Sequence, residues 1–278
     1  MPYSIREERS SGSSFWAIVR GYFDASADTD INLFKKQGTD ISLPIRYSKI
    51  EGLEIHCHLV DYEDELTKPW DMAKRWTFSQ GQSHYDPLGW ISKLLEEKVP
   101  LGSEEKRWLL MSGLTLSEWY INRLTHLWVK RGNLISAHHM FDQGLNYLFD
   151  MLFALNNQLV ADMKWRYYCA ERLAQLPPHF EERIKNTMLL QAFSVEEPER
   201  RQGAFMEMWR DMVPIIEQEV DMPYAEFSHL IKQRNYLKYL YMTTRSNIRK
   251  HMKLVPYIRL DQKDLVCTRS FFAMFFIS

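Results

Sequence analysis

Three polar side chains of metal-binding type alternate along the stretch DTDIN at residues 28–32. Side chains two residues apart in a β-strand point to the same face, so Asp28, Asp30 and Asn32 are expected to lie together at the start of one strand. Two neighbouring carboxylates repel each other, and keeping both ionised requires solvent or a cation. Oxygen ligands of this kind suit Mg²⁺. The alternative is the polar edge of a hairpin that binds no ion.

A second group of candidate ligands alternates along LEIHCHLVD, residues 53–61. Glu54, His56 and His58 fall on one face of the expected strand, and the intervening side chains are apolar or cysteine. Two histidines two residues apart in a strand can share a metal ion, with Asp28 or Asp30 supplying an oxygen. The alternative is a solvated strand face whose histidines are only hydrogen-bonded.

The composition favours a globular protein without a strong electrostatic preference for any partner. The 35 Lys and Arg residues against 36 Asp and Glu give a net charge of −1, so no basic excess indicates nucleic-acid binding. Three widely spaced cysteines suit a reducing, cytoplasmic environment better than a disulfide framework. The apolar ending FFAMFFIS is too short to span a bilayer, so we expect no membrane segment.

The elements that position these residues are predicted to change character along the chain. Residues 15–60 show the period-two pattern of strands, and an acidic connector at 61–69 precedes a helix near 70–80. The sequence YDPLG at 85–89 indicates a turn, because proline fixes φ and glycine allows positive φ. A helix is expected from Trp90 onward.

From about residue 102 the apolar spacing is helical throughout. Helices are expected at 103–132 and 133–158, then up to the prolines at 177–178, then two more and a last one at 224–251. The broad apolar stripe at 134–155 predicts a largely buried helix, and it would also permit a homodimer. The chain is thus predicted to be α+β, with domains at 1–95 and 96–278.

Three stretches resemble the nucleotidyltransferase superfamily of the kanamycin and lincosamide kind with a helical C-terminal half. They are the stretch from Gly21 to Asn32, the segment 54–89 with its Trp-led helix and YDP turn, and the segment 131–177. The resemblance implies a small mixed nucleotidyltransferase-like β-sheet domain followed by an α-helical bundle. It covers most of residues 15–200.

The resemblance also implies roles for individual residues. In the family, a Gly-Ser pair holds the nucleotide phosphates, and two acids separated by a hydrophobic residue bind Mg²⁺, which stabilises displacement at the α-phosphorus. Gly21 matches the glycine, Tyr22 stands at the serine position, Asp30 matches the first acid and Asn32 the second.

Two further positions complete the expected site. The third carboxylate position falls at Glu54 or His56, and Asp28 could partly replace the missing acid. Arg75, on the Trp-led helix, could reach the triphosphate of ATP or another NTP.

Two hypotheses follow. The first is an enzyme that uses Mg²⁺ to transfer a nucleoside monophosphate from an NTP to a hydroxyl of a small molecule, with Asp30 as the main metal ligand. The second is a catalytically weakened or inactive protein of the same fold that acts as a nucleotide-binding or protein-interaction module. Asn32 favours the second hypothesis, because an amide oxygen can ligate Mg²⁺ but brings no charge.

Overall fold

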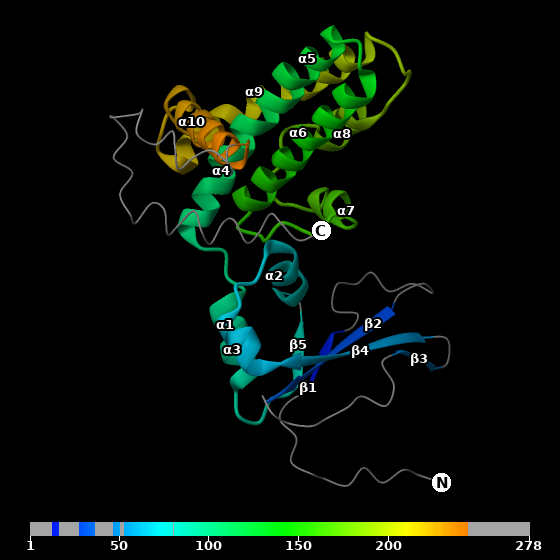
Figure 1. Ribbon diagram of the computed structural model, residues 1–278, viewed down its shortest axis with the longest axis vertical. Coiled ribbons are helices and arrows are strands. Elements are labelled where there is room, and N and C mark those ends of the chain that lie inside the picture. Colours follow the sequence, from blue (N-terminus) through cyan, green and yellow to red (C-terminus); the bar gives the residue numbers. More distant parts are fainter. Residues whose placement is uncertain (1–12, 17–27, 37–46, 51–52, 80, 244–278) are drawn as a thin grey trace. The chain divides into compact units, whose positions relative to one another are not determined.

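The computed structural model describes residues 13–16, 28–36, 47–50, 53–79 and 81–243. Within these ranges the chain divides after Pro100 into two compact units. The first contains a mixed sheet with short helices and the second is helical (Figure 1). This confirms the predicted α+β class. The division falls slightly later than the expected boundary at residue 95, because that residue lies inside a helix that continues to Lys98.

The described strands of the first unit form one sheet in the order β3-β4-β2-β1-β5. Their bounds are β1 Ser13–Trp16, β2 Asp28–Lys35, β3 Tyr47–Ile50, β4 Leu53–Asp61 and β5 Gln82–Tyr85. β2 and β4 pair in parallel, and the other neighbours pair antiparallel. The sequence does not predict β5, because four residues of mixed polarity carry no clear period and become a strand only by pairing with β1.

A small apolar core packs against one face of this sheet. Phe34 of β2 packs with Trp70, with Phe78 of α2 (Met72–Ser79) and with Ile91 and Leu94 of α3 (Trp90–Lys98), and all five are buried. Side chains two apart share a strand face, so this face also carries Asp30 and Asn32. The same face is therefore apolar at the carboxyl end of β2 and polar at its start.

The segment expected to be an acidic connector contains a short helix, α1 (Tyr62–Thr67). Asp61 is its N-cap, and its carboxylate accepts a hydrogen bond from the backbone N–H of Asp64 at 3.3 Å. Acidic side chains in the first turn are favourable beside the positive end of the helix dipole. The charges that suggested a loop thus stabilise the start of a helix.

The second unit is built around two long antiparallel segments. The first contains α4 (Ser103–Glu118), a π-helical turn η1 (Trp119–Leu124) and α5 (Thr125–Lys130) without interruption. The sequence predicts the whole stretch as one ordinary helix. In the π turn, the Thr125 hydroxyl donates to the carbonyl of Tyr120 at 2.9 Å, and the Gln202 amide donates to the carbonyl of Ile121 at 2.6 Å. These side chains donate hydrogen bonds to backbone carbonyls where the hydrogen-bond pattern of the α-helix changes to that of a π-helix.

The other long segment is α6 (Leu134–Leu155), which forms the centre of the bundle. Most of its apolar stripe, including Leu148, Met151 and Leu152, is buried against the unit's own helices. The unit's own helices therefore cover most of the stripe, and the expected homodimer stays a prediction.

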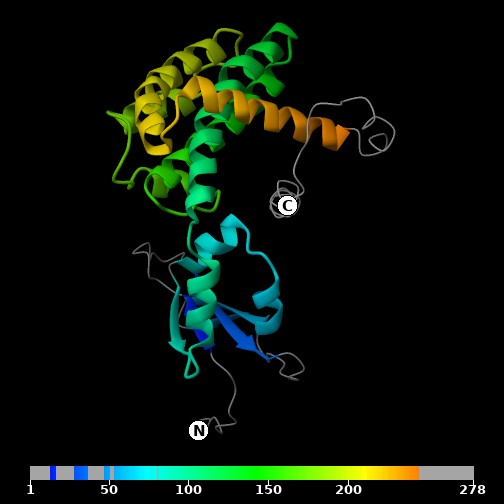
Figure 2. The same cartoon turned by 90° about the vertical axis from the view of Figure 1, so that its left-hand side faces the viewer.

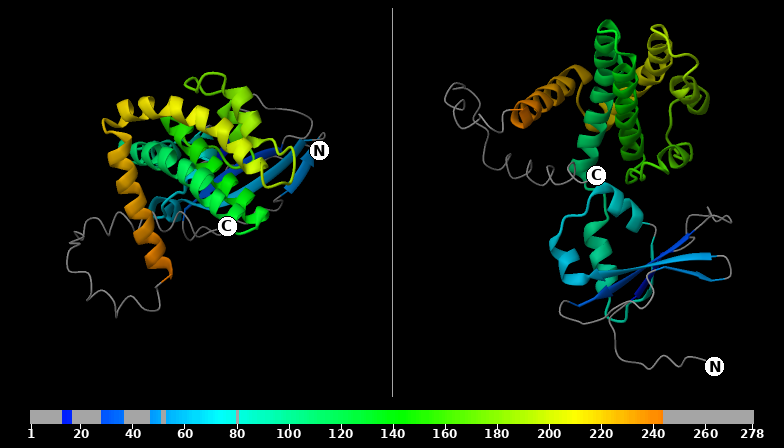
Figure 3. Two further views of the ribbon diagram at one scale, coloured as in Figure 1. Left: turned by 90° about the horizontal axis from the view of Figure 1, so that it is seen from above. Right: turned by 45° about the vertical axis from the view of Figure 1, so that its right-hand side comes forward.

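The remaining described helices are α7 (Arg166–Ala170), α8 (Phe180–Met188), α9 (Glu197–Val220) and α10 (Tyr224–Thr243). Of these helices, α7 and α9 contact α6, α8 packs on α9, and α10 packs on α4. α7 is much shorter than expected. α9 and α10 meet at a corner where Asp221 has a positive φ of 47° (Figure 3). α10 contacts α4 and then extends away from the bundle (Figure 2). In the part of the chain that the structure describes, no helix is long and apolar enough to cross a bilayer.

Candidate functional site

The parallel pairing of β2 with β4 brings the two predicted groups of ligands into register. Asp28 lies opposite Glu54, Asp30 opposite His56, and Asn32 opposite His58. On this face of the β2–β4 pair, three successive pairs of opposite residues are thus of types that bind metal ions. Of Asp28 and Glu54, the structure describes the backbone alone.

Asp30 is the centre of this face. Its carboxylate Oδ1 lies 3.2 Å from Nε2 of His58 and 4.0 Å from Nδ1 of His56. In the tautomer with a proton on Nε2, His58 donates a hydrogen bond to the carboxylate. The Asp30 side chain is 47 % exposed, so a ligand can reach it from solvent.

The arrangement is poorer in carboxylates than a typical Mg²⁺ site. Among the side chains that the structure describes, no three His, Cys, Asp or Glu residues are placed to hold a metal ion. Asn32 is half-buried and adds a neutral oxygen at best. Asp30 and the two histidines would therefore need to rearrange, or to be joined by Asp28 or Glu54, to bind a divalent cation tightly.

The sheet explains why these polar residues gather where they do. Along β4, His56 and His58 are followed two residues later by Val60, which packs against the apolar core beside Phe34. Burial of Phe34 and Val60 fixes the face of both strands, since a slip of one residue would turn Phe34 away from this core and would move Asp30 to the opposite face with it. Burial of the apolar ends of β2 and β4 thus determines the face on which Asp30, His56 and His58 lie.

Of the other predicted positions, Arg75 does not join this group. The guanidinium of Arg75 is buried, and it donates to the carbonyls of Val99 at 3.4 Å and Pro100 at 2.6 Å. The proposed contact of Arg75 with a triphosphate is therefore replaced by a structural one at the end of α3. Gly21 and Tyr22, expected to line the phosphates, lie outside the described residues.

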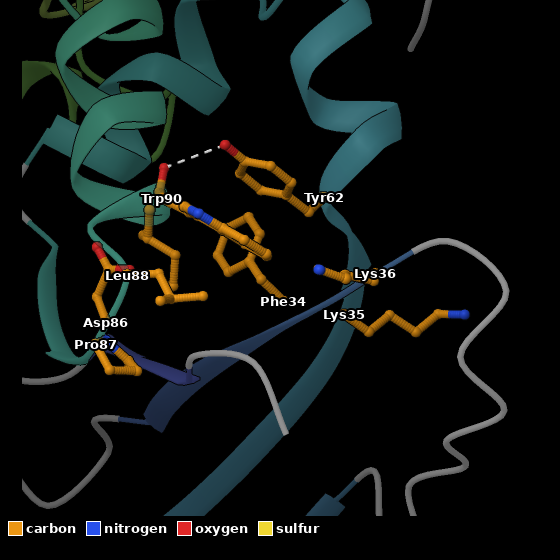
Figure 4. Close-up of a pocket in the computed structure, with 9 residues that line it drawn as sticks. Phe34, Lys35, Lys36, Tyr62, Asp86, Pro87, Leu88 and Trp90 are labelled. Atoms are coloured by element: carbon orange, nitrogen blue, oxygen red, sulfur yellow. Dashed lines mark hydrogen bonds between the residues drawn. The ribbon is translucent and has the colours of Figure 1, made fainter. Parts of the chain in front are cut away.

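A small pocket lies near the carboxyl end of β2, and Asp30, His56 and His58 are not among the residues that line it (Figure 4). The Tyr62 ring stacks on Trp90 with centroids 5.5 Å apart, and the Lys36 ammonium lies 4.5 Å from the centre of the Trp90 ring. Aromatic rings and a cation could suggest a base-binding site. Its volume of about 20 Å³ is sufficient for a water molecule and far too small for a nucleobase.

Sequence reasoning placed Glu54 or His56 beside the acids but did not select His58 as the side chain nearest Asp30. The signal was present in the alternation of residues 53–61, which puts His56 and His58 on one face. The missing information was the register of β2 and β4. A shift of the pairing by two residues keeps every side chain on the same face but gives it a different partner. The aromatic pocket had no local signal, since Tyr62 and Trp90 are distant in sequence.

No protein-family model matches the chain, and no curated protein matches it significantly. Among solved structures, the chain is similar to a nucleotidyltransferase-like protein from Exiguobacterium sibiricum. The likeness covers 76 % of this chain and 72 % of that chain, at 12 % sequence identity and a TM-score of 0.43. A likeness this distant assigns no activity to the site described above.

Proposed function

We propose that this chain is a nucleotidyltransferase-like protein that binds a nucleoside triphosphate together with a divalent cation at Asp30, with weakened transfer chemistry. The observation that carries the proposal is the exposed Asp30 carboxylate held beside His56 and His58 on the neighbouring parallel strand. Asp30, with His56 and His58 beside it, would hold the cation, which would supply positive charge to offset the negative charge on the oxygens of the α-phosphate.

The proposed weakening follows from the charges around Asp30. A site in which Asp30 is the one carboxylate among the described side chains attracts Mg²⁺ less than a site with two or three acids. Imidazole nitrogens suit transition metals better than Mg²⁺, so Mn²⁺ should support tighter nucleotide binding than Mg²⁺ at this site. The transferred group would go to a hydroxyl of a small-molecule acceptor, as the sequence resemblance implies.

The direct test is calorimetric titration of the full chain with ATP, GTP, CTP and UTP, each with Mg²⁺, with Mn²⁺ and with EDTA. We expect saturable binding of at least one nucleotide that requires the cation. Asp30→Asn should weaken that binding by at least about tenfold, because it removes a charged ligand worth about 1.5–3 kcal/mol. Glu96→Gln, which removes an exposed carboxylate from α3, is the matched control and should bind as the parent does.

Two results would overturn the proposal in different ways. Binding that is absent with every cation, or equal in Asp30→Asn and the parent, would remove Asp30 from any nucleotide site. Multiple-turnover release of pyrophosphate in the presence of kanamycin or another hydroxyl-bearing acceptor, at about 1 s⁻¹ or faster, would show an efficient transferase instead. A rate far below that range, with tight cation-dependent binding, is the expected outcome.

A further inference from the structure

A histidine of α6 packs against the loop that joins α8 to α9. This loop spans residues 189–196, and we call it the α8–α9 loop. The His138 ring lies 5.4 Å from the Phe193 ring, centroid to centroid, with 33° between the ring planes. Phe193 is 62 % exposed, so one side of its ring packs on His138 and the remainder faces solvent. The His138 ring is therefore a support for the second half of this loop.

The hydrogen bonds of His138 show which of its nitrogen atoms carries the proton. Nδ1 lies 3.0 Å from a guanidinium nitrogen of Arg201, and a guanidinium can only donate, so Nδ1 is the acceptor. Nε2 then carries the proton of the neutral ring. Nε2 is buried and has no hydrogen-bond partner among the described residues. The observed contact therefore requires a neutral imidazole.

Arg201 is held in place next to His138. Its side chain is 4 % exposed, and its Nε donates to the carbonyl of Thr187 at 2.8 Å. The guanidinium also donates to Asp142 Oδ1 at 3.4 Å and lies 4.0 Å from the centre of the Phe141 ring. Arginine keeps its charge throughout the physiological pH range. A proton added to Nδ1 of His138 would therefore face a fixed cation at 3.0 Å, and the hydrogen bond from Arg201 would be lost.

The other charged groups around His138 are acidic. In the described part of the chain, the charged groups that act on His138 are Arg201 and Glu197 of α9 and Asp142 of α6. Asp142 is 63 % exposed and already binds Arg201, and Glu197 forms an ion pair with Arg200. Burial, followed by the charge of Arg201, holds the pKa of His138 below its ordinary value of 6.5 in spite of the two carboxylates.

We propose that His138 is a pH switch that holds the second half of the α8–α9 loop at neutral pH and releases it in acid. With Nδ1 unprotonated, the ring accepts the hydrogen bond from Arg201 and packs on Phe193. A proton taken up from solvent at Nδ1 removes this bond, and repulsion from Arg201 displaces the ring from Phe193. The packed state is favoured above the ordinary histidine pKa of 6.5, and this contribution is lost as pH falls through the lower pKa of the packed state. The switch lies wholly within the helical unit, so it is independent of nucleotide binding at Asp30.

The first half of the loop should stay in place. The guanidinium of Arg200 donates to the carbonyl of Leu189, and the Glu197 carboxylate accepts from the backbone N–H of Gln191 at 3.0 Å. Neither bond involves the histidine. Hydrogen bonds from Arg200 hold the pKa of Glu197 at about 2, so this carboxylate stays ionised in mild acid. Release is therefore limited to residues 192–196.

The test is fluorine NMR of the full chain with 4-fluorophenylalanine in place of Phe193, recorded from about pH 8 to about pH 5. We expect the transverse relaxation rate of this ring to fall by at least about twofold with a midpoint below pH 6.5, because a released ring moves on the ps–ns timescale independently of the bundle. The same label in place of Phe180, which is buried in α8, is the internal control and should relax at a constant rate.

Three variants assign the titrating group. His138→Asn removes the titrating ring and keeps an oxygen that can accept from Arg201, so its relaxation rate should not change with pH. His139→Asn, at the exposed neighbouring position of α6, is the matched control and should keep the change seen in the parent. Asp142→Asn removes a carboxylate that favours the imidazolium, so it should move the midpoint to lower pH. Helical circular dichroism checks that each variant is folded.

Several results would overturn the proposal. One is a relaxation rate at position 193 that is independent of pH in the parent or equally dependent on pH in His138→Asn. A change of chemical shift without a change of relaxation rate would show that His138 titrates without releasing the loop. Loss of the change in His139→Asn, or a midpoint raised by Asp142→Asn, would assign the titration to another group. A label at Phe180 that changes together with the label at 193 would show unfolding of the bundle instead of local release.

Discussion

The closest approach between α4 and α6 gives a sharp test of the helical packing. A Cβ added at Gly113 would lie 2.5 Å from Cβ of Met151, 2.8 Å from the backbone oxygen of Tyr147 and 3.1 Å from Cα of Met151. None of these atoms can move away by rotation of a side chain. In Gly113→Ala the two helices must therefore separate, since carbon atoms pack at about 3.5–4.0 Å.

The expected change in the free energy of unfolding of Gly113→Ala is the sum of two opposing terms. Relief of the 2.5 Å contact requires a local separation of about 1 Å, and overpacking in a close-packed core costs about 1–3 kcal/mol. Because two of the three contacts involve backbone atoms, we expect the upper end of that range. Alanine gains about 1 kcal/mol over glycine inside a helix. The net loss should be about 2 kcal/mol, or a fall in Tm of about 4–8 °C.

Gly203→Ala is the matched control, because it is the same substitution inside α9. No atom lies within 4 Å of the added Cβ at Gly203, so the variant should gain about 0.4–1 kcal/mol. The assay is urea unfolding followed by helical circular dichroism, with the slope of each transition checked for equal cooperativity. A Gly113→Ala variant as stable as the parent, or stabilised like Gly203→Ala, would refute the close helix contact.

Two further predictions concern pH. Hydrogen bonds from Arg200 hold the pKa of the Glu197 carboxyl down at about 2. Stability from the ionised form is present above the unfolded pKa near 4.5 and lost as pH falls toward 2, so Glu197→Gln should destabilise the chain at pH 7 and much less at pH 2–3.

Burial raises the pKa of the Asp150 carboxyl to about 6 in spite of Arg166 at 3.8 Å. Stability therefore falls as pH rises from about 4 to about 6 and stays at its lower value above pH 6, so Asp150→Asn should stabilise the chain at pH 7–8 and be neutral below about pH 4. Urea unfolding across this pH range checks both, and a pH-independent effect of either variant would contradict its assignment.

The sequence by itself determined much of the secondary structure. Alternation in residues 28–35 and 53–61 predicts two strands, and helical spacing from residue 102 predicts a bundle, and both form. These predictions succeed because the side-chain periods of strand and helix are local geometric properties. The burial of the stripe in α6 follows from the same pattern.

The tertiary structure decided how distant residues meet. The register of β2 with β4 places His56 and His58 beside Asp30. Burial of Phe34 and Val60 under helices that come later in the chain fixes this register. Arg75 binds carbonyls at the end of α3 for a similar reason, since its burial leaves its donors no water to bind.

The surface of the bundle was likewise decided by packing. The sequence alone cannot show that the apolar residues at 134–155 are mostly buried and those at 188–195 are exposed, because both segments are rich in hydrophobic residues. The difference is that other helices pack against α6, whereas Arg200 and Glu197 form hydrogen bonds with the backbone of the loop between α8 and α9 and leave its side chains at the surface. Which apolar groups remain exposed depends on contacts between elements far apart in the chain, and those contacts exist only in the folded protein.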